Sequence, residues 1–126
     1  MTIHQDWTIV FYIEENEVSP IDVFLSGLDA RSKAKFDLAI EQLRIRNVTA
    51  HEPLVKHIRG KVYELRIESQ TNIYRIMYFF YTGRRIVLLH GFQKKTQKTP
   101  NRDIAVAVKR KNHFVQREGG VSRKSV

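Results

Sequence analysis

The spacing of apolar positions changes along the chain, and each spacing predicts a kind of secondary structure. The run at 7–13 is aromatic and β-branched, which is typical of a buried strand. Ser19 and Pro20 form a helix start, and Gly27 ends this short helix. A second helix, with an aspartate as its cap, covers 29–46. Both helices carry one apolar stripe, so we expect a helical hairpin that packs on a sheet.

From residue 61 onwards, apolar residues recur at every second position, as they do in strands. Segment 61–68 alternates between two sets of side chains, namely Tyr63, Leu65 and Ile67, and Glu64, Arg66 and Glu68. In segment 72–81 both alternating sets of side chains are mostly apolar, which indicates a central strand that is buried on both faces. Gly83 then forms a tight turn into a third run at 84–92. The three runs predict an antiparallel meander.

A final helix is predicted from 99–100, where a proline suits the first helical position, to 118–120. Its inner face is expected to hold Ile104, Val108 and Val115. The elements follow the order β-α-α-β-β-β-α in one α+β domain, an antiparallel meander covered by the helical hairpin and the C-terminal helix. We assign this domain to residues 1–120 and a flexible basic tail to residues 121–126.

The formal net charge of the chain is +9, and it is unevenly distributed. Residues 1–53 carry 5 basic and 9 acidic side chains, residues 54–82 carry 5 and 2, and residues 83–126 carry 12 and 2. The net charge of these segments therefore changes from −4 through +3 to +10. Such a gradient attracts a polyanion to the C-terminal part. RNA, DNA, an anionic membrane and an acidic protein all fit this field, as does a basic protein without any nucleic-acid role.

Composition also bears on cofactors and location. The chain has no cysteine, which fits a reducing compartment and excludes a disulfide framework. Its histidines show no metal-ligand spacing and its glycines form no nucleotide-binding loop, so we expect no metal and no cofactor. No secretion signal begins the sequence and no apolar run has the length of a membrane span, so we expect a cytoplasmic protein without a membrane partner.

Arg75 is the first candidate for chemistry, because it interrupts the most apolar strand of the predicted meander. A guanidinium in such a place is costly unless it has a partner. The structural interpretation is an ion pair with Glu64 or Glu68. The functional interpretation is a guanidinium that holds a phosphate through two hydrogen bonds.

The end of the last predicted strand supplies further candidates. Alternation along the strand places His90 on the same side as Ile86 and Leu88. His90 is either a core or rim residue or an acid–base group. Three lysines follow before the final helix, at Lys94, Lys95 and Lys98. Basic residues beside a helix N-terminus suit phosphate binding, although most such runs are solvated surface.

A longer pattern in segment 54–112 resembles a known family. It contains in order Tyr63-Glu64-Leu65-Arg66, Tyr74-Arg75-Ile76, Leu88-Leu89-His90-Gly91-Phe92, Lys94-Lys95 and Thr99-Pro100. This series resembles the phage-derived branch of the RelE/HigB-like toxin superfamily, and the preceding strand and helical hairpin agree with it in order. The resemblance implies a RelE-like domain.

The resemblance also implies a function, that of the toxin in a type II toxin–antitoxin module. Such a toxin is a ribosome-dependent endoribonuclease that cleaves mRNA, and its partner is an antitoxin with a helix-turn-helix domain. Operator DNA is then bound only through the antitoxin. In the implied mechanism the ribose 2′-hydroxyl attacks the adjacent phosphorus without a metal. The protein orients the phosphate, stabilises charge and moves protons.

By similarity, Arg66 and Arg75 take phosphate-binding positions of the family, and Lys94 or Lys95 takes its C-terminal basic position. No tyrosine follows Tyr81, so the catalytic tyrosine of RelE-type toxins has no counterpart here. We expect His90 and the lysines to substitute for it. The predicted site comprises catalytic Arg75, Lys94, Lys95 and His90, phosphate-binding Arg66, Lys61, Lys98 and Arg85, and supporting Glu64. Two alternatives remain open: a non-catalytic toxin on the same scaffold, of the gyrase-inhibitor type, and a basic nucleic-acid-binding module.

Overall fold

Five strands and three α-helices form the described part of the chain, which is residues 6–95 and 98–124 of a computed structural model. In chain order they are β1 (Thr8–Phe11), α1 (Pro20–Ser26), α2 (Ala30–Arg46), the 3-10 turn η1 (Asn47–Thr49), β2 (Val55–Arg59), β3 (Val62–Ser69), β4 (Asn72–Tyr81), β5 (Arg85–Lys94) and α3 (Asn101–Lys124). The predicted α+β order is confirmed, with β2 as an additional strand. None of the helices described is both long and apolar enough to cross a membrane.

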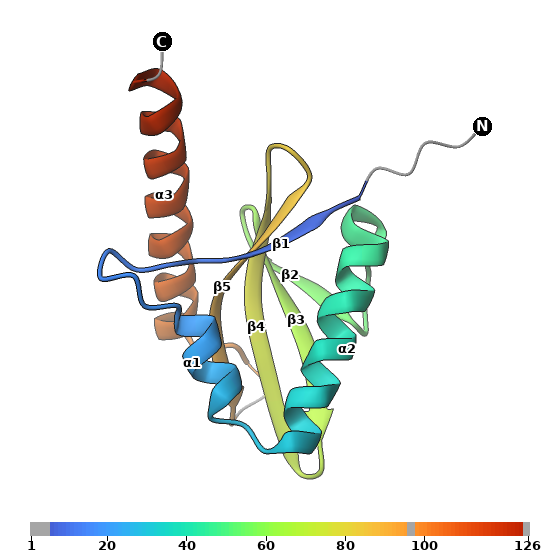
Figure 1. The fold of residues 1–126 in the computed structure, drawn as a ribbon. Coiled ribbons are helices and arrows are strands. Elements are labelled where there is room, and N and C mark those ends of the chain that lie inside the picture. The colour runs from blue at the N-terminus through green and yellow to red at the C-terminus, as the bar shows by residue number, and fades with distance from the viewer. Residues whose placement is uncertain (1–5, 96–97, 125–126) are drawn as a thin grey trace, which may run out of the picture.

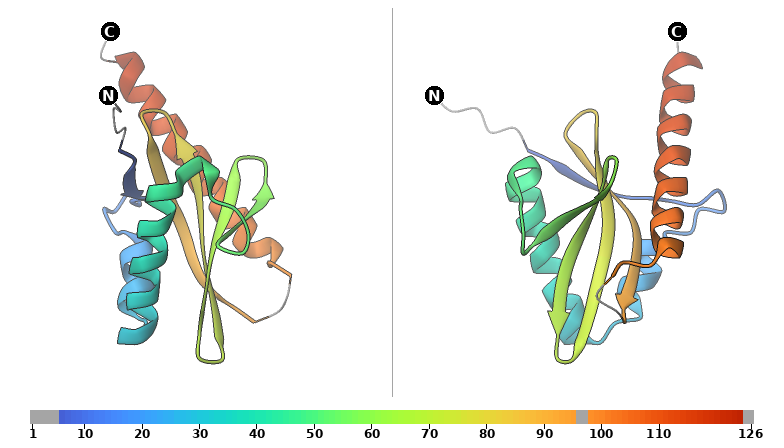
Figure 2. Two further views of the ribbon diagram at one scale, coloured as in Figure 1. Left: turned by 90° about the vertical axis from the view of Figure 1, so that its right-hand side faces the viewer. Right: turned by 180° about the vertical axis from the view of Figure 1, so that it is seen from behind.

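The strands form one sheet in the order β1-β5-β4-β3-β2. Strands β2 to β5 pair antiparallel, which confirms the predicted meander, and β1 pairs parallel to β5. Helices α1 and α2 cover one face of this sheet, on β5 and β3 respectively, and α3 packs on β5 and β4 from the other face (Figures 1 and 2). The molecule therefore has two apolar cores, one on each side of the sheet.

The first two helices begin where their caps predict. The Ser19 hydroxyl accepts a hydrogen bond from the backbone N–H of Asp22 at 3.2 Å, and Pro20 is the first residue of α1. The Asp29 carboxylate accepts from the N–H of Ser32 at 3.4 Å at the start of α2. These local contacts set where the two helices begin, and packing on the sheet then holds the hairpin in place.

The ends of the domain differ from the expectation in three ways. Strand β1 is shorter than 7–13 and half-buried, because it lies at an edge of the sheet. Helix α3 continues past 118–120 to Lys124. Val115 is 39% exposed, and Phe114 takes the inner position by packing on Phe79 and Tyr81. That residues 121–126 form a flexible tail stays a prediction.

A bulge in β5 corrects the predicted orientation of His90. Met77 pairs with His90, but the next residue of β4, Tyr78, pairs with Leu88, so Leu89 is an extra residue in β5. The side-chain alternation therefore shifts by one, and His90 faces α3 rather than the side of Leu88. Gly91 then faces α1, where an added Cβ would lie 2.3 Å from the ring of Phe24.

Candidate functional site

Four cationic side chains from four neighbouring strands lie on the α3 side of the sheet. Lys56 of β2 pairs with Glu64 of β3, and Arg66 of β3 pairs with Arg75 of β4. Lys94 of β5 pairs with Ile73, two residues before Arg75. Because residues paired across strands share a face, the four cations gather around Glu64. We call Lys56, Glu64, Arg66, Arg75 and Lys94 the cation cluster.

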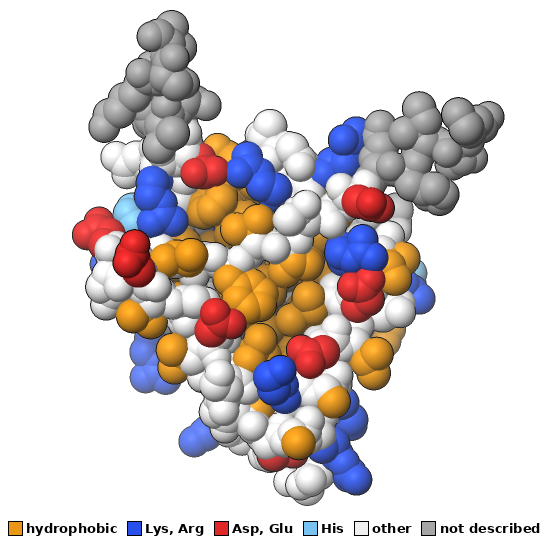
Figure 3. Space-filling view, viewed as in Figure 1, with side chains coloured by type: hydrophobic (Ala, Val, Ile, Leu, Met, Phe, Trp, Pro, Cys, Tyr) orange, Lys and Arg blue, Asp and Glu red, His pale blue; other side chains and the backbone are white. Residues whose placement is uncertain are grey.

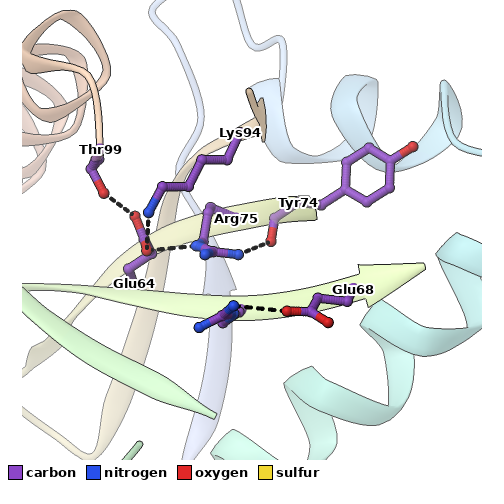
Figure 4. A network of polar contacts seen from close by, with 7 residues as sticks. Glu64, Glu68, Tyr74, Arg75, Lys94 and Thr99 are labelled. Carbon is purple, nitrogen blue, oxygen red and sulfur yellow. Dashed lines mark hydrogen bonds and ion pairs between the residues drawn. The ribbon is translucent and has the colours of Figure 1, made fainter. Parts of the chain in front are cut away.

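Glu64 is the centre of this cluster (Figure 4). Its Oε1 accepts a hydrogen bond from Arg75 Nε at 2.7 Å and lies 4.0 Å from Lys94 Nζ. Its Oε2 accepts from the hydroxyl of Thr99 at 2.9 Å, just before α3 begins. A further guanidinium nitrogen of Arg75 donates to the carbonyl of Tyr74 at 3.2 Å. The predicted structural pair of Arg75 with Glu64 is therefore present.

Burial determines the electrostatics at the centre. The side chains of Glu64, Arg75 and Lys94 are only 2%, 4% and 5% exposed. Burial is the main reason that the pKa of Lys94 is lowered from its ordinary value. The charge of Glu64 opposes this shift, and those of three neighbouring cations add to it, namely Arg75, Lys56 and Arg66. Burial lowers the pKa of Arg75 as well, but a guanidinium stays charged near neutral pH.

The outer part of the cluster is open to solvent. Arg66 is 41% exposed and donates to Glu68, which is 60% exposed, at 2.7 Å. Lys56 is exposed on the edge strand β2. Lys95 and Lys98, which follow β5, are exposed too. A polyanion that approaches this face meets these side chains before it reaches the buried pair of Arg75 and Glu64.

A second polar network holds the start of α3 beside the cluster. His90 Nε2 lies 2.7 Å from the carboxylate of Asp103, and its Nδ1 lies 3.3 Å from a guanidinium nitrogen of Arg110. Arg110 also donates to the Leu89 carbonyl at 2.9 Å and to Glu14 at 3.1 Å. Burial lowers the pKa of His90, which favours the neutral ring. We infer that Nε2–H donates to Asp103 and that Nδ1 accepts from Arg110, so both ring nitrogens have protein partners.

The predicted site residues fall into separate groups. Arg75, Lys94, Arg66 and Glu64 are brought together, and His90 lies on the same side of the sheet. Arg85 is at the far end of β5, where it donates to Glu118 and to the Thr82 carbonyl, each at 2.8 Å. Lys61 is exposed in the turn before β3. The structure therefore does not bring Arg85 to the cluster.

Several contacts of the site were missed at the sequence level. Lys56 was overlooked because β2 was not predicted. Thr99 was recognised only as part of a helix start and Asp103 was not proposed as a site residue, whereas each holds a site residue. Arg110, which contacts His90, was not proposed as a site residue either. Across residues 6–95 and 98–124, no three histidine, aspartate or glutamate side chains are placed to hold a metal ion together.

Comparisons with known proteins bear on the same region. The family described as "Phage derived protein Gp49-like (DUF891)" matches residues 23–112, which include the whole cation cluster. Two curated relatives from two strains of Mycobacterium tuberculosis, each named "Probable endoribonuclease HigB1", are 41% identical to the chain over 56 residues. The match covers 44% of this chain and 44% of each relative, so it spans less than half the length of the relatives.

Proposed function

Because this chain belongs to the phage-derived Gp49-like family of RelE/HigB-like toxins, we propose that it is the toxin of a type II toxin–antitoxin module and cleaves mRNA on the ribosome. The observation that carries the proposal is the cation cluster on one face of the sheet. A phosphodiester that is being cleaved gains negative charge, and fixed cations in a partly buried site stabilise that charge. The similarity to proteins named as probable endoribonucleases supports the same reaction.

The residues of the cluster suit a reaction in which RNA supplies its own nucleophile. The ribose 2′-hydroxyl attacks the adjacent phosphorus, and we assign its proton to the amine of Lys94, whose lowered pKa favours the neutral form. Arg66 binds the phosphate, and Arg75 with Glu64 positions Lys94. The 5′-oxygen leaves as the cyclic phosphate forms. We assign the proton that it gains to Lys95, the exposed lysine beside Lys94 in the chain.

His90 has a positioning role in this proposal. Its two ring nitrogens contact Asp103 and Arg110, both on α3, and its ring stacks on Phe92 with centroids 5.4 Å apart. A histidine whose nitrogens are both engaged cannot exchange a proton with substrate until one contact breaks. We therefore assign His90 to holding α3 against the sheet, which keeps Thr99 on Glu64.

The partners follow from the same assignment. The proposal includes an antitoxin with a helix-turn-helix domain, which binds operator DNA on behalf of the complex, and mRNA presented by the ribosome in the cytoplasm. The charge of +10 on residues 83–126 favours binding of RNA and ribosome to the C-terminal part of the chain.

End-group analysis of cleaved transcripts tests the reaction. We expect fragments with a 2′,3′-cyclic phosphate or a 3′-phosphate upstream and a 5′-hydroxyl downstream, because the nucleophile is internal to the ribose. A metal-activated water would instead usually leave a 5′-phosphate. An mRNA with a single 2′-deoxyribose at the mapped cleavage position should resist cleavage. Efficient cleavage of that mRNA, or fragments with 5′-phosphates, would contradict the mechanism.

One observation favours a second function, a toxin that inhibits its target without catalysis. Arg75 and Lys94 are buried and bound to Glu64, so the substrate must reach them through the exposed cations. A protein that only binds a polyanionic target would use the exposed cations of this face, such as Arg66 and Lys95. Induced expression that stops growth while every transcript stays intact would select this alternative.

A further inference from the structure

Strand β2 adds an exposed lysine to the edge of the cation cluster. Val55 points into the core on the α1 and α2 side, and its neighbour Lys56 therefore points to the α3 side. Lys56 pairs with Glu64 in the register of β2 and β3, and its positive charge contributes to the lowered pKa of Lys94. Lys56 thus belongs to the cluster by register and by electrostatic contact.

The charge balance leaves Lys56 without a counter-charge. Glu64 lies between Arg75 and Lys94, and Glu68 binds Arg66. Among the ion pairs of the residues that the structure describes, none includes Lys56. The four cations of the cluster therefore face two carboxylates, Glu64 within the cluster and Glu68 beside it, and the uncompensated positive charge extends to an exposed side chain. An exposed lysine without a protein partner is free to bind an anion at little cost in desolvation.

We propose that Lys56 binds a phosphate of the RNA backbone next to the phosphate that Arg66 holds, so that the RNA lies across β2 and β3 before it reaches Lys94. This inference rests on the proposed function and names one further substrate contact. The competing explanation is that Lys56 only protects an edge strand from pairing with other chains, which is a common use of lysine at sheet edges.

The test is the salt dependence of RNA binding, because each phosphate that a protein neutralises adds to the slope of log affinity against log salt concentration. The probe is a fluorescent single-stranded oligoribonucleotide with 2′-O-methyl groups throughout, which the proposed reaction cannot cleave. The variants are Lys56→Gln and, as a matched control, Lys33→Gln. Lys33 is a half-exposed lysine of α2, on the opposite face of the sheet, so its substitution makes the same change in net charge.

We expect Lys56→Gln to weaken binding and to reduce the slope by about 0.7, the value for one phosphate contact on a single strand. Lys56→Arg should retain the wild-type slope, and Lys33→Gln should change it little. Melting temperatures of the Lys56 variants should match that of wild type, and Lys33→Gln should melt only slightly earlier, because it loses an exposed ion pair with Asp37. A Lys56→Gln slope equal to that of Lys33→Gln would overturn the proposal, and reduced solubility with unchanged binding would assign Lys56 to edge protection.

Cleavage of transcripts separates this inference from the function on which it rests. If wild-type protein cleaves transcripts and Lys56→Gln binds RNA as well as wild type, only the role of Lys56 fails. If Lys56→Gln lowers the slope as expected and wild-type protein cleaves nothing, the phosphate contact is supported while the endoribonuclease proposal fails. A wild-type slope near zero overturns the proposal, because no phosphate is then neutralised.

Discussion

Replacing Glu64 with glutamine removes the one negative charge at the centre of the cluster. The variant keeps the size of the side chain and an oxygen that can accept the hydrogen bond from Thr99. It leaves Arg75 and Lys94 buried beside each other, with side chains 4% and 5% exposed, and without a carboxylate between them. Buried charges of the same sign repel each other strongly in a medium of low dielectric constant.

Loss of one partner from a buried ion pair typically costs about 3–5 kcal/mol in unfolding free energy. Domains are stable by only about 5–15 kcal/mol, so Glu64→Gln should remain folded with a small margin. Lys94 can relieve part of the cost by releasing its proton, which Arg75 cannot do. Its pKa in the folded variant then falls further below the unfolded value, so the unfolded state binds more protons and stability rises with pH between the two values.

Urea unfolding followed by far-ultraviolet circular dichroism measures this effect at pH 7 and pH 9. The matched control is Glu68→Gln, which breaks the exposed pair with Arg66 and should cost no more than about 1 kcal/mol. The Glu64 variant should lose more stability than the control at pH 7 and regain part of it at pH 9. Equal losses in the two variants, with the same pH dependence as wild type, would show that the buried charges are not coupled through Glu64.

Two more outcomes follow from the structure. The rate of cleavage should increase with pH, because burial favours the neutral amine of Lys94 and only that form accepts a proton. The midpoint of the increase should lie below the ordinary lysine pKa of about 10.4. A single-turnover pH–rate profile without such an increase would contradict this assignment. Gly91→Ala should destabilise the fold by about 1–3 kcal/mol in urea unfolding, because the new Cβ would lie 2.3 Å from the ring of Phe24. The double variant with Phe24→Leu should be less sensitive to the added methyl group, and an unchanged midpoint for Gly91→Ala would refute the close packing.

Local signals predicted the helical hairpin well, whereas the short strand β2 escaped prediction. The caps of α1 and α2 are contacts within a few residues, so the sequence carries them directly. Strand β2 has five residues, of which Lys56, His57 and Arg59 are exposed, and it has no strong alternation of its own. It is a strand because it pairs with β3, which is a tertiary effect. The spacing of apolar residues along the sequence therefore could not predict that Lys56 lies beside Glu64.

The orientation of His90 depends on the extra residue at Leu89. Alternation of apolar and polar residues in the sequence does not reveal such a bulge. Because of this bulge His90 faces α3 and meets Asp103, while Thr99, four residues earlier, meets Glu64. Two hydrogen bonds, from Thr99 to Glu64 and between Asp103 and His90, thus connect segment 99–103 to the α3 side of the sheet. The sequence pattern supplied most of the charged residues of the site, including the pair of Arg75 and Glu64. The bulge in β5 places His90 and Lys94 on the α3 side of the sheet, and contacts between distant segments bring Thr99 to Glu64 and Asp103 to His90.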